Sequence, residues 1–130
     1  MPDSTRDEIM ILVVDDDQSI RELFAELLKS QGYRIVAAES AAQALDILAA
    51  LPICLIISDH SMPDKTGGRL IQEVRTLYNG TRTILASANP HLPHLAQLAG
   101  ADRYFLKGEP LTNLLTIIDE LIGDGRRMAS

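Results

Sequence analysis

The chain alternates five times between a short apolar run and a segment with helical periodicity. The apolar runs are rich in Ile, Val and Leu and are too short for helices, so they predict strands. They are Ile9–Val14, Arg34–Ala38, Ile53–Ile57, Arg82–Ala86 and Tyr104–Leu106. Strands that alternate with helices are typical of an α/β fold whose parallel sheet is covered by helices on both faces.

The segments between the runs carry apolar side chains three and four positions apart, which predicts amphipathic helices. These helices centre on Ile20–Leu28, Ala44–Leu48, Leu70–Tyr78, Leu92–Ala99 and Leu111–Ile122. Gly32 is a stop signal after the first helix, and Ser40 with Gln43 forms a capping box at the second. Pro110 is predicted at the first position of the last helix. Pro90 and Pro93 predict a short fourth helix, because proline is tolerated only in a first turn.

The composition predicts one domain without disulfides. The 130 residues are 46% hydrophobic and 23% charged, and the longest apolar run, six residues, is too short to cross a membrane. The single cysteine, Cys54, cannot form an internal disulfide, which suits the cytoplasm. Twelve basic residues against eighteen acidic ones give a net charge of −6, which argues against direct nucleic-acid binding. The domain is expected over residues 9–122, between flexible ends at 1–8 and 123–130.

Polar side chains follow four of the five predicted strands. Asp15-Asp16-Asp17 comes after the first strand, Asp59 after the third, Ser87 after the fourth and Lys107 after the fifth. In open α/β sheets, ligands bind outside the carboxyl ends of the strands, near the point where the strand order reverses. A sheet order of 2-1-3-4-5 makes these four strands neighbours and places the second strand at an edge.

Asp15, Asp16 and Asp59 are therefore expected within several ångströms of one another. At a separation of about 5 Å and an effective dielectric constant of about 20, each pair of like charges costs roughly 3 kcal/mol. A cation has to neutralise such a trio, and carboxylate oxygens favour Mg²⁺. Lys107 supplies a second positive charge and Ser87 a hydroxyl group. This set of groups predicts phosphoryl transfer to the Asp59 carboxylate.

The chain resembles the receiver domain of bacterial two-component response regulators over nearly its whole length. The segments that carry the resemblance are Ile11–Asp17, Ser58–Gly67, Ile84–Ala88, Ala99–Asp102 and Tyr104–Lys107. The resemblance implies a flavodoxin-like, doubly wound (βα)5 fold: a three-layer sandwich around a parallel sheet of order 2-1-3-4-5.

The same resemblance implies a role for each matching site residue. Asp59 would accept a phosphoryl group from a phosphohistidine on a sensor histidine kinase or a histidine phosphotransfer protein. Asp15, Asp16, Asp59 and the main-chain carbonyl of Ser61 would hold Mg²⁺. Ser87 and Lys107 would bind the phosphoryl oxygens. Tyr104 would be the switch aromatic, turning inward when Ser87 is drawn toward the phosphate.

A receiver of this kind is a switch with weak self-dephosphorylation, not a turnover enzyme. Its output domain or partner protein would dock on the face made by the fourth helix, the fifth strand and the fifth helix, where a second copy could also bind. Two departures from the family pattern bear on this. Gly108 follows Lys107 where the family usually has proline, and the segment from Ser87 to Gly100 is short.

Two alternatives stay open. A degenerate receiver would use the same fold as a phosphorylation-independent interaction module. An aspartate-nucleophile phosphatase of the haloacid-dehalogenase kind would use Asp15-x-Asp17-x-Ser19, with Asp15 as its nucleophile. The sequence also leaves open whether the chain acts alone or belongs to a longer protein with an output domain.

Overall fold

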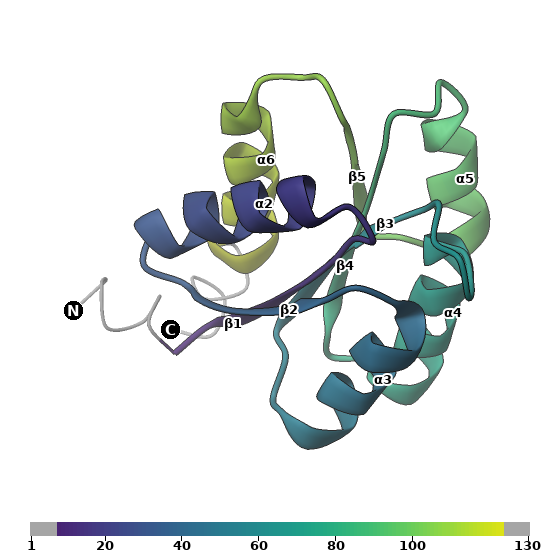
Figure 1. Ribbon diagram of the computed structural model, residues 1–130, viewed down its shortest axis with the longest axis horizontal. Helices are drawn as coiled ribbons and strands as arrows, with labels where there is room; N and C mark the ends of the chain where they lie inside the picture. Colours follow the sequence, from purple (N-terminus) through teal and green to yellow (C-terminus); the bar gives the residue numbers. More distant parts are fainter. Residues whose placement is uncertain (1–7, 124–130) are drawn as a thin grey trace.

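A computed structural model describes residues 8–123, and a five-stranded parallel sheet runs through its centre (Figure 1). The strands are β1 (Met10–Val14), β2 (Arg34–Ala38), β3 (Leu55–Asp59), β4 (Arg82–Ser87) and β5 (Arg103–Leu106). Their order in the sheet is β2-β1-β3-β4-β5, and each neighbouring pair is parallel. The predicted strand order is confirmed.

Helices cover both faces of the sheet, so the molecule has three layers (Figure 1). The helices are α2 (Gln18–Ser30), α3 (Ala41–Ala50), α4 (Gly67–Leu77), α5 (Leu92–Ala99) and α6 (Leu111–Ile118), and a π-helical turn over Asp119–Gly123 follows α6. Helices α2 and α6 pack on one face of the sheet, and α3, α4 and α5 pack on the other. Among the described residues, no helix is long and apolar enough to span a membrane.

The core follows from the alternation of side chains along the central strands. In β1, Ile11 and Val13 face α2 and α6, whereas Leu12 and Val14 face α3 and α4. Every residue of β1 and β3 is buried, as expected for strands in the middle of a covered sheet. The predicted edge strand, β2, keeps exposed and half-buried positions and lies at one edge.

Several helix boundaries lie where the sequence signals predict them. Asp17 caps α2, because its side chain accepts hydrogen bonds from the main-chain N–H groups of Ser19 and Ile20. Gly32, with a φ of 95°, stands just beyond that helix. Gly100, with a φ of 74°, ends α5 after only eight residues, which confirms the predicted short fourth helix.

Two local predictions are wrong, and a third holds in part. Strand β3 begins at Leu55 rather than Ile53, because Ile53 N–H bonds to the Leu51 carbonyl in a turn, and Cys54 is half-buried outside the strand. Pro110 is the N-cap of α6 and not its first helical residue, since its ψ of 136° is not helical. At α3 the predicted cap is confirmed, since Ser40 Oγ accepts from the N–H of Gln43, although the Gln43 side chain accepts in return from the N–H of Glu39 rather than that of Ser40.

Candidate functional site

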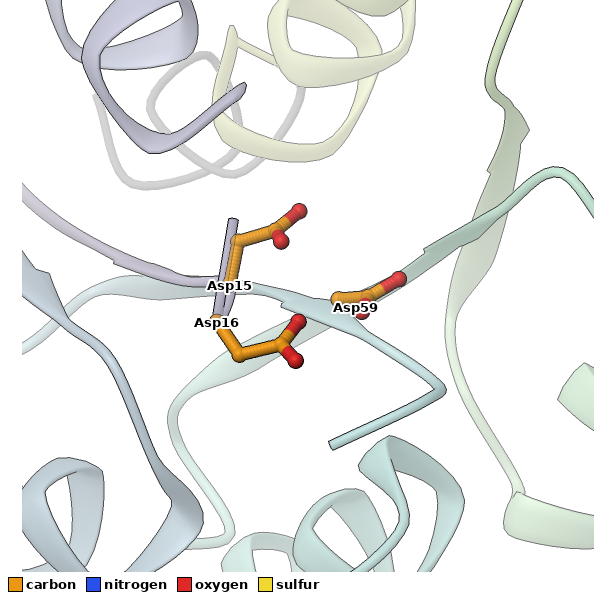
Figure 2. Close-up of side chains that lie close together, drawn as sticks. All are labelled: Asp15, Asp16 and Asp59. Carbon is orange, nitrogen blue, oxygen red and sulfur yellow. The ribbon is translucent and has the colours of Figure 1, made fainter. Parts of the chain in front are cut away.

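The carboxyl ends of β1 and β3 bring three carboxylates together (Figure 2). Val14 pairs with Ser58 across the sheet, so the residues that follow them, Asp15 and Asp59, are neighbours. One oxygen of each of these two and one of Asp16 all lie within 4.8 Å of one another. Asp15 and Asp59 are buried, whereas Asp16 is exposed to solvent. The acidic cluster predicted from the sequence is therefore present.

Lys107 supplies the positive charge at this cluster. Its Nζ donates to Oδ2 of Asp15 and to Oδ1 of Asp59, each at 2.8 Å. The lysine follows β5, and its main-chain N–H donates to the carbonyl of Ser87 at the end of β4. The long side chain thus reaches across the end of β4 to the two central strands. One ammonium group against three carboxylates leaves the cluster negatively charged.

The environment raises the pKa of Asp59 above its usual value. Burial is the main cause, since it disfavours the charged carboxylate, and the charge of Asp15 acts in the same direction. The hydrogen bond from Lys107 opposes both but does not cancel them. For Lys107, burial lowers the pKa, but the hydrogen bonds to Asp15 and Asp59 outweigh it, and its pKa is raised. Lys107 is therefore a charged donor at neutral pH.

Arg21 holds the turn that carries the first two carboxylates. Its guanidinium donates to the main-chain carbonyl of Asp15 at 2.7 Å, while Oδ1 of Asp15 accepts from the N–H of Asp17 at 2.9 Å. These bonds fix both the main chain and the side chain of Asp15. Sequence reasoning missed Arg21, because its partner is a carbonyl group, which any residue would provide.

The loop between β3 and α4 closes tightly behind Asp59. Gly67 N–H donates to the carbonyl of His60 at 2.8 Å, and a Cβ at Gly67 would lie 2.0 Å from the Asp59 carbonyl oxygen. Only glycine fits at this close approach. Ser61, whose carbonyl was expected to hold Mg²⁺, is exposed in the same loop.

Ser87 and Tyr104 lie outside the cluster of charged groups. Asp59 pairs with Ala86 across the sheet, and Ser87 follows Ala86 at the end of β4. The Ser87 side chain is buried, and its Oγ accepts from the N–H of Asn89 at 3.1 Å. Tyr104 on β5 is 44% exposed and points to solvent rather than into the site.

Comparison with known proteins identifies the family. A family model described as the response regulator receiver domain matches residues 11–119, which is most of the chain. The chain belongs to the response regulator receiver domain family. Receiver domains are phospho-acceptor switches of two-component signalling that interact with histidine kinases, and the acidic trio of this receiver is typical of a Mg²⁺ site. Membership of this family excludes the haloacid-dehalogenase alternative, in which Asp15 would be the nucleophile.

Solved receiver structures share the fold. The response regulator TrrA of Thermotoga maritima, determined in complex with Mg²⁺ and BeF, has a TM-score of 0.81 and 32% identity, covering 87% of this chain and 98% of that one. A CheY-like receiver domain protein of Methanospirillum hungatei has a TM-score of 0.85 and 27% identity, covering 92% of this chain and 98% of that one.

Curated relatives include much longer proteins. The response regulator FleR of Pseudomonas aeruginosa is 37% identical over 89 residues, and the sensor histidine kinase RcsC of Escherichia coli is 42% identical over 74 residues. These alignments cover 68% and 57% of this chain, but only 16% of FleR and 8% of RcsC. The receiver fold therefore occurs in these relatives as one part of a larger protein.

Proposed function

We propose that Asp59 is the phospho-acceptor of this receiver and that the donor is a phosphohistidine on a sensor histidine kinase or a histidine phosphotransfer protein. The observation that carries the proposal is the bridge from Lys107 Nζ to Asp15 and Asp59, at 2.8 Å each, inside a cluster of three carboxylates. A buried carboxylate that contacts a charged ammonium donor has the composition of a phosphoryl-transfer site.

In the proposed reaction, a carboxylate oxygen of Asp59 attacks the phosphorus atom and forms a new P–O bond. The P–N bond to the histidine breaks, its electron pair stays on the imidazole nitrogen, and an acyl phosphate remains on Asp59. Lys107 would donate to a phosphoryl oxygen, and the Ser87 hydroxyl would donate to another. Both groups act by position and charge, because phosphoryl transfer asks little covalent chemistry of a protein.

The residues present fit a divalent cation. Asp15, Asp16 and Asp59 offer carboxylate oxygens within 4.8 Å of one another, and oxygen donors suit a hard ion such as Mg²⁺. These three residues and the carbonyl of Ser61 would hold it. Bound there, Mg²⁺ would neutralise charge on the carboxylates and on the transferring phosphoryl group.

The proposed switch runs from the phosphorylated site to a docking face. Ser87 would move toward the phosphoryl group and Tyr104 would turn inward, which shifts the balance between two conformers. An output domain, a partner protein or a second copy would bind the face formed by α5, β5 and α6. We further propose that residues 9–122 form the receiver domain and that it works in the cytoplasm. The flexible ends predicted at 1–8 and 123–130 lie mostly outside the described residues.

The experiment that tests this function is intact-protein mass after incubation with acetyl phosphate, with and without Mg²⁺. We expect the wild type to gain one phosphoryl group only with Mg²⁺, and Asp59→Asn to gain none. Asp15→Asn should slow the gain without moving the modified residue. A gain that maps to Asp15 would overturn the proposal. No gain despite Mg²⁺ binding, together with unchanged partner binding by Asp59→Asn, would favour the degenerate receiver.

A further inference from the structure

The β3–α4 loop, residues 60–66, is tied to both helices that flank it. The carboxylate of Asp64 accepts the main-chain N–H groups of Ala41 and Ala42 in α3, at 3.3 and 3.0 Å, across more than twenty residues of chain. On the other side, Lys65 forms an ion pair with Glu73 of α4. The loop that follows Asp59 is thus held against α3 by Asp64 and against α4 by Lys65.

Asp64 supplies the acceptors that α3 does not provide for itself. The first N–H groups of a helix have no partner within the helix. Ser40 Oγ accepts from the N–H of Gln43, and the carbonyl of Ser40 accepts from Ala44, which leaves the N–H groups of Ala41 and Ala42. Asp64 accepts both. A negative charge at a helix N-terminus is favourable, and these hydrogen bonds, that from Ala42 foremost, lower the pKa of Asp64.

The same loop carries Ser61, whose carbonyl is a proposed Mg²⁺ ligand three residues before Asp64. The hydrogen bond from Gly67 N–H to the His60 carbonyl closes the base of the loop. Asp64 fixes the loop's far side on α3. We propose that Asp64 is a positioning residue for the metal site, holding the loop so that the Ser61 carbonyl faces a cation bound by Asp15, Asp16 and Asp59. This inference rests on the proposed function.

Asp64 would thus couple the metal site to the N-terminus of α3, although it is not itself one of the proposed metal ligands. Since such coupling between two sites is reciprocal, a cation that holds the loop would also strengthen the hydrogen bonds that the Asp64 carboxylate accepts from α3. Mg²⁺ should therefore slow hydrogen exchange at the amides of Ala41 and Ala42. This effect should disappear when the Asp64 carboxylate is removed.

Ser40→Ala is a matched control for Asp64→Ala. Ser40→Ala removes one acceptor from the N-terminus of α3 and Asp64→Ala removes two, but only Asp64→Ala releases the loop. Mg²⁺ dissociation constants are measured by isothermal titration calorimetry on the wild type, both variants and Asp64→Asn, below their unfolding temperatures. We expect Asp64→Ala to weaken Mg²⁺ binding about tenfold, as for other residues that orient metal ligands. Ser40→Ala should bind like the wild type, and Asp64→Asn, which keeps one acceptor oxygen, should lie between.

Equal Mg²⁺ affinity in Asp64→Ala and the wild type would overturn the inference. So would a loss of Mg²⁺ affinity in Ser40→Ala as large as that in Asp64→Ala, because the effect would then come from weakening of α3. If Asp64→Ala does not fold, the comparison of Asp64→Asn with Ser40→Ala decides in the same way. A wild type that binds no Mg²⁺ would overturn the proposed metal site together with the inference. A wild type that binds Mg²⁺ and is phosphorylated, with no loss in the Asp64 variants, would overturn the inference alone.

Discussion

Asp59 would have to be ionised to act as the proposed nucleophile, yet its surroundings oppose ionisation. Burial and the charge of Asp15 raise its pKa, and the hydrogen bond from Lys107 only partly compensates. The ionised carboxylate is therefore less favourable in the folded protein than in the unfolded chain. The site therefore holds a group whose negative charge weakens the fold, and a cation bound beside it would compensate that charge.

This conflict predicts that Asp59→Asn stabilises the metal-free protein at neutral pH. Because the folded-state pKa of Asp59 is raised, its protonated form favours folding, and that advantage is lost as the pH rises through the folded-state pKa. The variant should therefore melt higher than the wild type near pH 7. The difference should shrink and vanish as the pH falls below the unfolded-state pKa of about 4. Thermal unfolding across this pH range measures it.

Glu26→Gln is the control, since it removes one negative charge from the exposed side of α2 and does not touch the site. Adding Mg²⁺ should raise the melting temperature of the wild type more than that of Asp59→Asn, because a ligand stabilises the form that binds it. If metal-free Asp59→Asn melts at or below the wild type at every pH in this range, the charge of Asp59 does not destabilise the fold.

At the level of elements, the approach of α4 to β3 depends on one glycine. A Cβ at Gly67 would lie 2.0 Å from the Asp59 carbonyl oxygen and within 3 Å of main-chain atoms of Asp59 and His60. Main-chain atoms cannot move aside as the end of a long side chain can. Gly67→Ala should therefore push α4 away from the end of β3 and lower the free energy of unfolding by about 2 kcal/mol, the usual scale for overpacking.

Urea unfolding of Gly67→Ala beside Gly80→Ala measures this effect. A Cβ at Gly80 meets nothing within 4 Å, so that variant should change the free energy of unfolding by less than about 0.5 kcal/mol. Similar losses of unfolding free energy in Gly67→Ala and Gly80→Ala would show that helix and turn propensities, rather than the contact with Asp59, cause the destabilisation.

The elements themselves could be predicted because their signals are local. Apolar runs and helical periodicity indicate strands and helices, and polar residues at four strand ends indicate the sheet order. The same reasoning brought Asp15, Asp59 and Lys107 together. Boundaries such as that at Pro110 were missed by one residue, because proline fits both at the N-cap and just after it.

Arg21 and Asp64 could not be predicted in the same way. Each binds main-chain groups: Arg21 the carbonyl of Asp15, and Asp64 the N–H groups of Ala41 and Ala42. Every residue has such groups, so nothing in the sequence indicates which of them will come within reach. Only the spatial arrangement of the β1–α2 turn, the β3–α4 loop and α3 shows these contacts.

Across the whole molecule, burial is greatest at the centre of the sheet. Strands β1 and β3 are buried along their full length and pair on both sides, whereas β2 and β5 form the edges. We expect the amides of β1 and β3 to exchange with solvent only on global unfolding. Those of β2 should exchange at least about tenfold faster, which corresponds to 1.4 kcal/mol. Native-state hydrogen exchange measures both, and equal protection of β2 and β3 would contradict this ordering.

The bridge made by Lys107 also has a consequence for synthesis on the ribosome. Lys107 stands 92 residues after Asp15, one of the two carboxylates it joins, and 48 after Asp59, the other. In a nascent chain, Asp15 and Asp59 are therefore translated long before the lysine whose ammonium group contacts both of them. A truncated translation product that ends before β5 therefore cannot form this bridge between the two central strands.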